Sequence, residues 1–455
     1  MENREELYAK LNDLLSEKRY REFVREIDEI NSVDAAEYLM TLPDDMLLAA
    51  YRMLKKNVAA DIFAELEPEL QESIIEKMSD KELSFIIEEL FVDDAVDMLE
   101  ELPASMVKRI LKLSKPDTRA LINKFLSYPE DSAGSIMTAE FIDLRKNMTV
   151  EEAVASIRKK GVDKETVYMA YVTDRSRVLE GIVSLKDLLF AKPETLIGDM
   201  METGIVSANT LDDKETVAAI IQKYDLLVLP VVDKENRLVG IVTVDDALDV
   251  IEEEATEDIE KMAAIVPGEK PYMRSSVLQI WKARIPWLLL LMLSATFTGQ
   301  IIAGFEGKLT AFPALIAFIP MLMGTGGNSG GQSSSTVIRG LATGEIENRD
   351  VFKIIWKEIR VALMCGIVLA VANFVKIILV DNLIFQNEVS LASAAVVSVT
   401  LLLTVIVAKI VGCVLPIGAK RLGLDPAVMA SPFITTIVDA ISLLIYFGVA
   451  TVILL

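Results

Sequence analysis

Five apolar stretches dominate the sequence from Trp281 onwards, at roughly 285–305, 310–338, 358–380, 390–418 and 427–455. Each can supply the ~20 residues that an α-helix needs to cross a hydrocarbon core of ~30 Å. A chain with this feature cannot fold as one soluble globule. We therefore expect a five-helix α transmembrane domain over residues 281–455, in contact with membrane lipid.

The basic residues between these stretches predict the orientation of the membrane domain. If the N-terminus is cytoplasmic, the two outer loops hold Lys308 alone, and the cytoplasmic loops hold Arg339, Arg349, Lys353, Lys357, Arg360, Lys420 and Arg421. This satisfies the positive-inside rule. The first residues, Met1–Tyr8, lack the pattern of a cleaved signal. We expect a multi-pass protein of the plasma (inner) membrane with a cytoplasmic N-terminus and an outward C-terminus.

Acidity is confined to the part of the chain before the apolar stretches. Residues 1–280 contain 59 acidic and 34 basic residues, a net charge of −25, whereas the remainder carries +3. An acidic surface repels nucleic acid and anionic lipid, which leaves cations or basic partners as candidates; the alternative is that acidity only confers solubility. Without histidine, and with Cys365 and Cys413 in apolar stretches, the chain offers neither a zinc site nor a disulfide framework.

Residues 1–128 show helical periodicity throughout. Similar helix ends recur at Thr41–Pro43, Leu66–Pro68 and Glu101–Pro103, with proline placed where the next helix begins. The recurrence predicts an all-α N-terminal helical solenoid.

Residues 129–250 contain one strand–turn–helix unit twice. Tyr171-Val-Thr-Asp and the segment Gly181–Asp187 are echoed 59 residues later by Pro230-Val-Val-Asp and the segment Gly240–Asp246. The unit resembles the paired cystathionine-synthase-type (CBS) domains, which implies an α/β regulatory module. Residues 243–262 then read as one long acidic helix, so we expect 251–280 to form a connecting segment that leads into the membrane.

Two features inside the apolar stretches are candidates for function. Asp439 is a carboxylate deep in the last stretch, where a charge costs at least ~2.5 kcal/mol and normally faces water or a partner. Protonation, or a pair with Lys409, is the alternative; Lys376 is expected to snorkel to the interface. The Gly324–Ser335 segment is expected to break the second helix and expose carbonyls to hydrated cations, the alternative being helix packing through small residues.

This combination of regions resembles the MgtE family of magnesium channels over nearly the whole chain. The specific matches are Gly326–Gln332, Arg339–Gly344, Asp425-Pro-Ala, Pro432, Thr435, Thr436 and Asp439. The resemblance implies a homodimer in which Asp439 of both subunits holds a largely hydrated Mg2+ in the pore, with Asn328 and the carbonyl near Thr435 close by. Magnesium releases water reluctantly and prefers oxygen ligands, so paired carboxylates suit it.

The resemblance also implies regulatory Mg2+ between acidic faces. The implied ligands lie in the N domain, the second CBS unit and the connecting "plug" helix: Asp93, Asp94, Asp97, Glu215, Asp225, Asp246, Asp249, Glu254, Glu257 and Asp258. Glu254, Glu257 and Asp258 share one helix face by spacing alone. For any single carboxylate a solvated surface position is the alternative.

The implied function is import of Mg2+ down its electrochemical gradient through a channel that cytoplasmic Mg2+ closes. A Na+-coupled divalent cation exchanger is the alternative. An enzyme is not expected, because the chain lacks histidine, a phosphate-binding loop and an evident nucleophile–base set. The turns ending in Asp187 and Asp246 suit the ribose of ATP, a candidate ligand of the CBS pair, although Leu226 stands where an adenine-stacking aromatic is expected.

Overall fold

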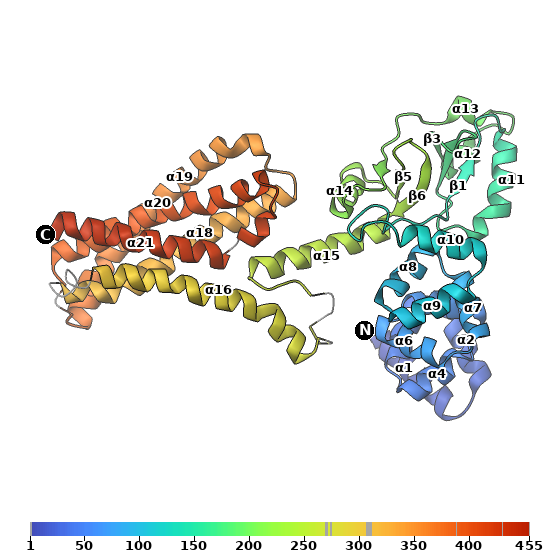
Figure 1. Cartoon of the computed structure of the whole chain (residues 1–455), viewed down its shortest axis with the longest axis horizontal. Helices are drawn as coiled ribbons and strands as arrows, with labels where there is room; N and C mark the ends of the chain where they lie inside the picture. Colours follow the sequence, from blue (N-terminus) through green and yellow to red (C-terminus); the bar gives the residue numbers. More distant parts are fainter. Residues whose placement is uncertain are drawn as a thin grey trace. The chain divides into compact units, whose positions relative to one another are not determined.

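The computed structural model describes residues 2–268, 272–273, 275–305, 312–387, 389–429 and 431–454. The chain forms two compact units, Met1–Ile251 and Glu252–Leu455, each of which is described by itself. Figure 1 shows the first unit as helices followed by two small sheets, and the second as long helices.

The N-terminal region is all-α, as predicted. Its helices are α1 (Glu2–Ser16), α2 (Tyr20–Glu29), α3 (Ser32–Met40), α4 (Asp44–Tyr51), α5 (Lys56–Ala64), α6 (Pro68–Lys77), α7 (Asp80–Glu89), α8 (Val92–Glu101), α9 (Ala104–Leu113) and α10 (Pro116–Phe125). Pro43 and Pro103 immediately precede α4 and α9, and Pro68 begins α6. Proline suits these positions because the first turn of a helix needs no amide donor.

The repeated unit folds twice into a three-stranded α/β module. The first sheet contains β1 (Ile142–Leu144), β2 (Met169–Thr173) and β3 (Leu179–Ser184), with helices α11 (Val150–Lys160), α12 (Leu185–Phe190) and α13 (Ile197–Met200). The second contains β4 (Ala208–Asn209), β5 (Val228–Val232) and β6 (Leu238–Thr243), with α14 (Lys214–Tyr224). In each sheet the first two strands are parallel and the last two antiparallel.

The two modules interlock through the segments that precede their sheets. Thr138, before β1, pairs with Ile241 of β6, and Glu202, before β4, pairs with Ile182 of β3. Between the sheets lies a shared apolar core that includes Phe141, buried beside β5 and β6 residues. Each module therefore pairs with a segment of the other, and the repeat predicted from sequence is confirmed as two similar α/β modules.

The acidic helix, α15 (Val244–Met262), is the last helix of the second CBS module extended without a break. The acidic helix predicted over residues 243–262 is confirmed, since its bounds differ from the prediction by one residue. The turn that opens it is fixed by Thr243, whose hydroxyl donates to Asp246 Oδ2 at 2.5 Å.

The second unit consists mainly of long helices (Figure 1). They are α16 (Val277–Gly304), α18 (Ile319–Ala342), α19 (Val351–Lys376), which continues as a π-helix over Ile377–Ile384, α20 (Leu391–Arg421) and α21 (Ser431–Leu454). Short 3-10 turns lie at Pro313–Phe318, Asn348–Asp350 and Pro426–Met429. Within the described ranges, four helical segments are long and apolar enough to cross a membrane: Val277–Gly304, Val351–Ile384, Leu391–Arg421 and Pro426–Leu454.

Helix α18, which covers most of the predicted second stretch, is not among those four, since glycine and serine lower its apolar content. The predicted break at Gly324–Ser335 is wrong, because α18 runs unbroken through it. A Cβ on Gly326 would lie 2.8 Å from Thr404 of α20, and one on Gly330 would lie 2.9 Å from Ile434 of α21. The glycines therefore serve close helix packing, which was the alternative interpretation.

Candidate functional sites

Four carboxylates from separate segments gather in the first unit: Asp93 and Asp94 of α8, Asp246 of α15, and Glu165 from the loop before β2. We call them the domain cluster. Burial and then repulsion from Asp94 and Asp246 raise the pKa of Asp93 well above its usual range. Burial and then repulsion from Asp246 raise the pKa of Asp94 to about 6 and that of Glu165 to about 7.

Among the described residues, no lysine or arginine acts on the charge of the domain cluster. Burial is also the main cause that raises the pKa of Asp246, and the other charges that act on the four groups are further carboxylates. Within the described part of the chain, no hydrogen-bond donor reaches Asp93 Oδ1. A cation would relieve both the burial cost and the repulsion.

The domain cluster is not a ready-made metal cage. Among the described residues, no three carboxylates converge closely enough to hold an ion directly. Mg2+ keeps several of its waters and commonly contacts only one or two carboxylates. Carboxylates that are close enough to repel one another, yet do not converge, therefore fit a largely hydrated Mg2+.

The other predicted ligands of this unit are more scattered. Asp249 follows Asp246 by one helical turn and acts electrostatically on both Asp246 and Glu65. Asp97 is exposed, one turn after Asp93. Glu215 and Asp225 lie at opposite ends of α14, a separation of ~15 Å at 1.5 Å per residue. Within one subunit, these last two cannot bind the same ion.

The C-terminal end of α15 carries a second acidic group, which we call the helix-end cluster: Glu257, Asp258 and Asp425. Here a lysine is present. Lys261 Nζ contacts Glu257 one turn earlier and lies 2.7 Å from Asp425 Oδ2, in the turn between α20 and α21. Although burial lowers it, hydrogen bonds to both carboxylates raise the pKa of Lys261.

Within the helix-end cluster Asp258 is half-buried, and burial followed by repulsion from Asp425 raises its pKa. Met262 of the same helix packs against Ile338 and Ala427. Glu254 lies one turn before Glu257 and Asp258 on the face that the sequence predicted. The last residues of α15, which themselves belong to the second unit, thus contact other parts of that unit.

Asp439, Thr435 and Asn328 lie on neighbouring helices. Thr435 and Asp439 are one turn apart on α21, and the Thr435 side chain would lie 2.8 Å from a Cβ on Gly327, the residue before Asn328. Asn328 is exposed and Asp439 half-buried. Asp439 Oδ1 is buried without a hydrogen-bond partner among the described residues. The α18–α21 contact therefore brings the three predicted positions into one region.

The alternative in which Lys409 pairs with Asp439 is wrong. Lys409 is buried and lies 3.7 Å from Glu358 Oε2 of α19, and its Nζ donates to Ser333 Oγ at 3.2 Å. Lys376 also has a specific partner, Asp381 at 2.9 Å, with its side chain 45% exposed. Neither of these two lysines therefore pairs with Asp439.

The two candidate ribose-binding turns are helix starts with different surroundings. Ser184 donates to Asp187 Oδ2 at 2.5 Å, and Asp187 is exposed. Asp246 makes the equivalent bond with Thr243 but belongs to the domain cluster. Of the two turns, only the one at Asp187 lies outside an acidic cluster.

Sequence reasoning missed several residues of these sites. Glu165 and Glu140 lie in irregular segments, and Asp425 was noted as part of a motif but not as a partner of the acidic helix. Lys261 was read only as one residue of that helix. Lys261 is the one basic residue of the otherwise acidic α15, and that contrast could have marked it as a candidate partner of the carboxylates.

Comparisons with known proteins agree with this arrangement. A family model described as a divalent cation transporter matches residues 319–449, one for the MgtE intracellular N domain matches 30–131, and the CBS domain matches 133–194 and 197–253. The magnesium transporter MgtE of Thermus thermophilus is 38% identical over 454 residues, 99% of each chain. The chain belongs to the MgtE family. The magnesium transporter MgtE of Bacillus subtilis is 34% identical over 98% of this chain and 97% of its own.

Two solved MgtE-type structures match the first unit. The soluble part of a magnesium transporter has a TM-score of 0.54 at 32% identity and covers 55% of this chain and 99% of its own. The cytosolic domain of the Mg2+ channel MgtE in complex with ATP has a TM-score of 0.51 at 38% identity, covering 53% and 99%. Membership of the MgtE transporter family confirms the predicted fold class, and the prediction that the chain is not an enzyme.

Proposed function

We propose that this MgtE-family chain forms a homodimeric, Mg2+-selective channel in the plasma (inner) membrane. Mg2+ enters the cell down its electrochemical gradient, drawn by ~2.3 kcal/mol per elementary charge per 100 mV. Cytoplasmic Mg2+ bound by the acidic faces of the first unit and of α15 closes the channel.

The observation that carries the conduction proposal is the unpartnered carboxylate of Asp439 beside α18. Its Oδ1 is buried without a donor among the described residues, and the nearby lysine, Lys409, is held by Glu358. A carboxylate in this position is available to the water shell of a passing cation. One subunit supplies one such group, so a two-fold dimer would place a pair around the ion.

The domain cluster supports the regulatory part of the proposal. Its carboxylates repel one another, on the order of 1 kcal/mol per close pair in water and more where solvent is excluded. A divalent cation that bridges them favours the compact arrangement, and α15 links the same region to the helices around Asp425. Bound Mg2+ thus biases the chain towards one of two states through its differential affinity.

The experiment is Mg2+ flux through the full chain reconstituted in liposomes. Asp439→Ala should abolish flux, whereas Glu345→Ala, which removes an exposed carboxylate from the α18–α19 loop, should leave it intact. Normal flux in the Asp439 variant would overturn the conduction proposal. Mg2+ applied to the cytoplasmic face in patch recordings should reduce the current, and undiminished current would overturn the regulation.

The same liposomes test the alternative of a Na+-coupled divalent cation exchanger. The reversal potential of the channel should follow the Mg2+ gradient alone. A shift of that potential when a Na+ gradient is imposed would favour the exchanger.

ATP binding at the CBS pair belongs to the same proposal, with the exposed Asp187 turn as the ribose contact. It is supported by the MgtE cytosolic domain solved with ATP. Leu226 is half-buried in place of an aromatic ring. ATP titrated against wild type and Asp187→Ala should bind the variant more weakly.

A further inference from the structure

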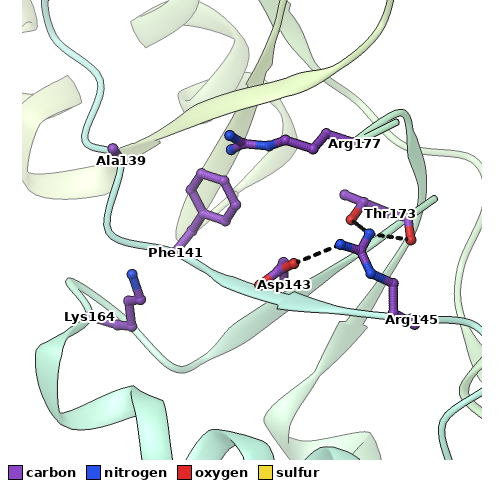
Figure 2. A pocket seen from close by; sticks show the side chains of 7 residues that line it. All are labelled: Ala139, Phe141, Asp143, Arg145, Lys164, Thr173 and Arg177. Carbon is purple, nitrogen blue, oxygen red and sulfur yellow. Dashed lines mark hydrogen bonds and ion pairs between the residues drawn. The ribbon is translucent and has the colours of Figure 1, made fainter. Parts of the chain in front are cut away.

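The first CBS module contains a cavity of about 330 Å³ that none of the proposed sites uses (Figure 2). It lies beside β1 and the C-terminal end of β2. Its lining contains an aromatic ring, three cations and one carboxylate: Ala139, Phe141, Asp143, Arg145, Lys164, Thr173 and Arg177. The excess of cations is unexpected in a unit that is strongly acidic.

Two of the charged residues already neutralise each other. Arg145 Nη1 donates to the Thr173 carbonyl at 2.9 Å, and its Nη2 lies 3.4 Å from Asp143 Oδ2 (Figure 2). Asp143 also lies 4.0 Å from Lys160. The carboxylate of the cavity is therefore balanced from within the protein, and it adds little repulsion towards an anion.

The other two cations, Arg177 and Lys164, have no carboxylate within ion-pair distance among the described residues. The Arg177 guanidinium lies 5.9 Å from the centre of the Phe141 ring. Its backbone is fixed, because its N–H donates to the Asp174 carbonyl at 3.1 Å and its carbonyl accepts from Leu238 at 2.9 Å. Arg177 is thus held at the cavity by the turn between β2 and β3.

The electrostatic surroundings reinforce this positive character. Burial and then repulsion from Arg177 lower the pKa of Lys124 on α10, an effect that Asp233 partly opposes. Arg177 and Lys124 therefore lie close enough to repel each other, although Asp233 offsets part of that charge, and neighbouring cations create a local field that attracts anions. Arginine and lysine are the side chains that commonly bind phosphoryl oxygens.

We propose that this cavity binds a small phosphorylated molecule, with Arg177 and Lys164 contacting its phosphoryl groups and Phe141 forming an apolar wall. The volume lies near the lower end of the ~300–1,000 Å³ typical of ligand pockets, so it exceeds what a single phosphate requires. The proposal depends neither on Mg2+ binding nor on transport.

This cavity is distinct from the proposed nucleotide contact at Asp187. Met169, at the start of β2, pairs with Ser184 of the Asp187 turn, whereas the cavity is lined by Thr173 at the other end of the strand. Four steps of ~3.3 Å place those ends ~13 Å apart. A ligand of the cavity can therefore be tested independently of the Asp187 turn.

The cavity also adjoins the domain cluster through shared backbone. Ala139 and Phe141 line the cavity, while Glu140 between them acts on Asp94 and Glu165. Lys164 lines the cavity, and the next residue, Glu165, belongs to the domain cluster. The segments 139–141 and 164–165 thus each place one or two side chains at the cavity and a carboxylate at or beside the domain cluster.

The experiment is calorimetric titration of the full, detergent-solubilised chain in Mg2+-free buffer with tripolyphosphate, ATP and adenosine. Tripolyphosphate and ATP should bind, and adenosine should bind at least 10-fold more weakly than ATP. Arg177→Gln and Lys164→Gln should each weaken tripolyphosphate binding by about 10-fold, as loss of one charge-assisted contact implies. The double variant should weaken it further, and Arg177→Lys should retain most of it.

Two controls separate the cavity from its surroundings. Arg175→Gln removes an exposed cation from the same turn, outside the cavity lining, and should leave binding unchanged. Asp187→Ala should leave tripolyphosphate binding unchanged even if ATP binding falls. Unchanged tripolyphosphate binding in the double variant, its loss in either control, or failure of wild type to bind tripolyphosphate would overturn the proposal. An unaltered circular dichroism spectrum confirms that each variant is folded.

Discussion

The domain cluster and the helix-end cluster contain the same chemical groups but balance their charge differently. Asp93, Asp94, Glu165 and Asp246 are held together by the fold, and the charged groups that act on them within the described part of the chain are further carboxylates. At the end of α15, Lys261 bridges Glu257 and Asp425. Lys261 thus neutralises part of the negative charge of the helix-end cluster, whereas in the domain cluster a bound cation or protonation would have to do so. We therefore expect the domain cluster to respond more strongly to divalent cations than the helix-end cluster.

The largest effect is expected from Asp93→Asn combined with Asp94→Asn, which removes two half-buried charges from the domain cluster. In Mg2+-free buffer, relief of repulsion should raise the free energy of unfolding of a fragment of residues 1–262 by ~1–4 kcal/mol. Added Mg2+ should then stabilise the variant much less than wild type. Thermal denaturation with and without Mg2+ measures both effects, and Asp45→Asn, at an exposed position, is the matched control. If Mg2+ stabilised the variant and the wild type equally, the domain cluster would not be the Mg2+-sensitive group.

The pH dependence of the same fragment should be the next largest effect. Because the folded-state pKa values of Asp94 and Glu165 are raised to about 6 and about 7, the folded state binds more protons than the unfolded state above pH ~4. This contribution to stability is present below the unfolded pKa values and is lost as the pH rises through 6 and 7. Thermal midpoints measured from pH 5 to 8 without Mg2+ should show the loss, and saturating Mg2+ should reduce it. A midpoint that rises over this range would contradict the assignment.

A smaller effect is expected from Lys261→Gln, which removes the positive charge that neutralises Glu257 and Asp425 in the helix-end cluster. Its carboxylates are partly exposed, so the lost ion pairs should cost no more than ~1 kcal/mol of stability. The more negative site should bind Mg2+ more tightly, and the Mg2+ concentration for half-closure should fall several-fold in patch recordings. Lys353→Gln, which breaks an exposed pair with Asp350, is the control. An unchanged or higher half-closure concentration would show that Lys261 does not substitute for an ion.

The smallest effect is expected from Asp225→Asn, at a predicted ligand outside both clusters. Asp225 is exposed and ends α14 with φ of 51°, a left-handed conformation that asparagine also tolerates. The change in stability should stay within ~0.5 kcal/mol, as for other surface substitutions. If Asp225→Asn strongly reduced the Mg2+-dependent stabilisation of the 1–262 fragment, Asp225 would have to be counted among the ligands of the domain cluster.

Sequence patterns predicted those parts of the fold that depend on periodicity. The 59-residue repeat places Val228–Val232 and Leu238–Thr243 in register with Met169–Thr173 and Leu179–Ser184, and the structure forms these strands. Asp93, Asp94 and Asp246 were expected as ligands by family resemblance, and the structure brings them together. Their roles as ligands stay predictions.

Long-range packing accounts for what the sequence did not reveal. Glu140 and Glu165 reach the domain cluster from irregular segments, where no periodicity marks them. The glycines of α18 read locally as helix breakers, but close contact with α20 and α21 outweighs their poor intrinsic propensity. Lys409 likewise pairs with Glu358, 51 positions away in the chain, and not with Asp439, the carboxylate that stood out in the sequence.

The contact between Gly330 and Gly412 limits how the membrane helices can move. A Cβ on Gly412 would lie 2.3 Å from the Gly330 carbonyl oxygen, so the two backbones meet almost directly. A slide of α18 along α20 by one residue, ~1.5 Å, would oppose a glycine with a bulkier neighbour such as Ser329 or Cys413. The close contact therefore disfavours sliding of α18 along α20. We expect a displacement at the Asp425 turn, which joins α20 to α21, to change the angle between helices rather than their register.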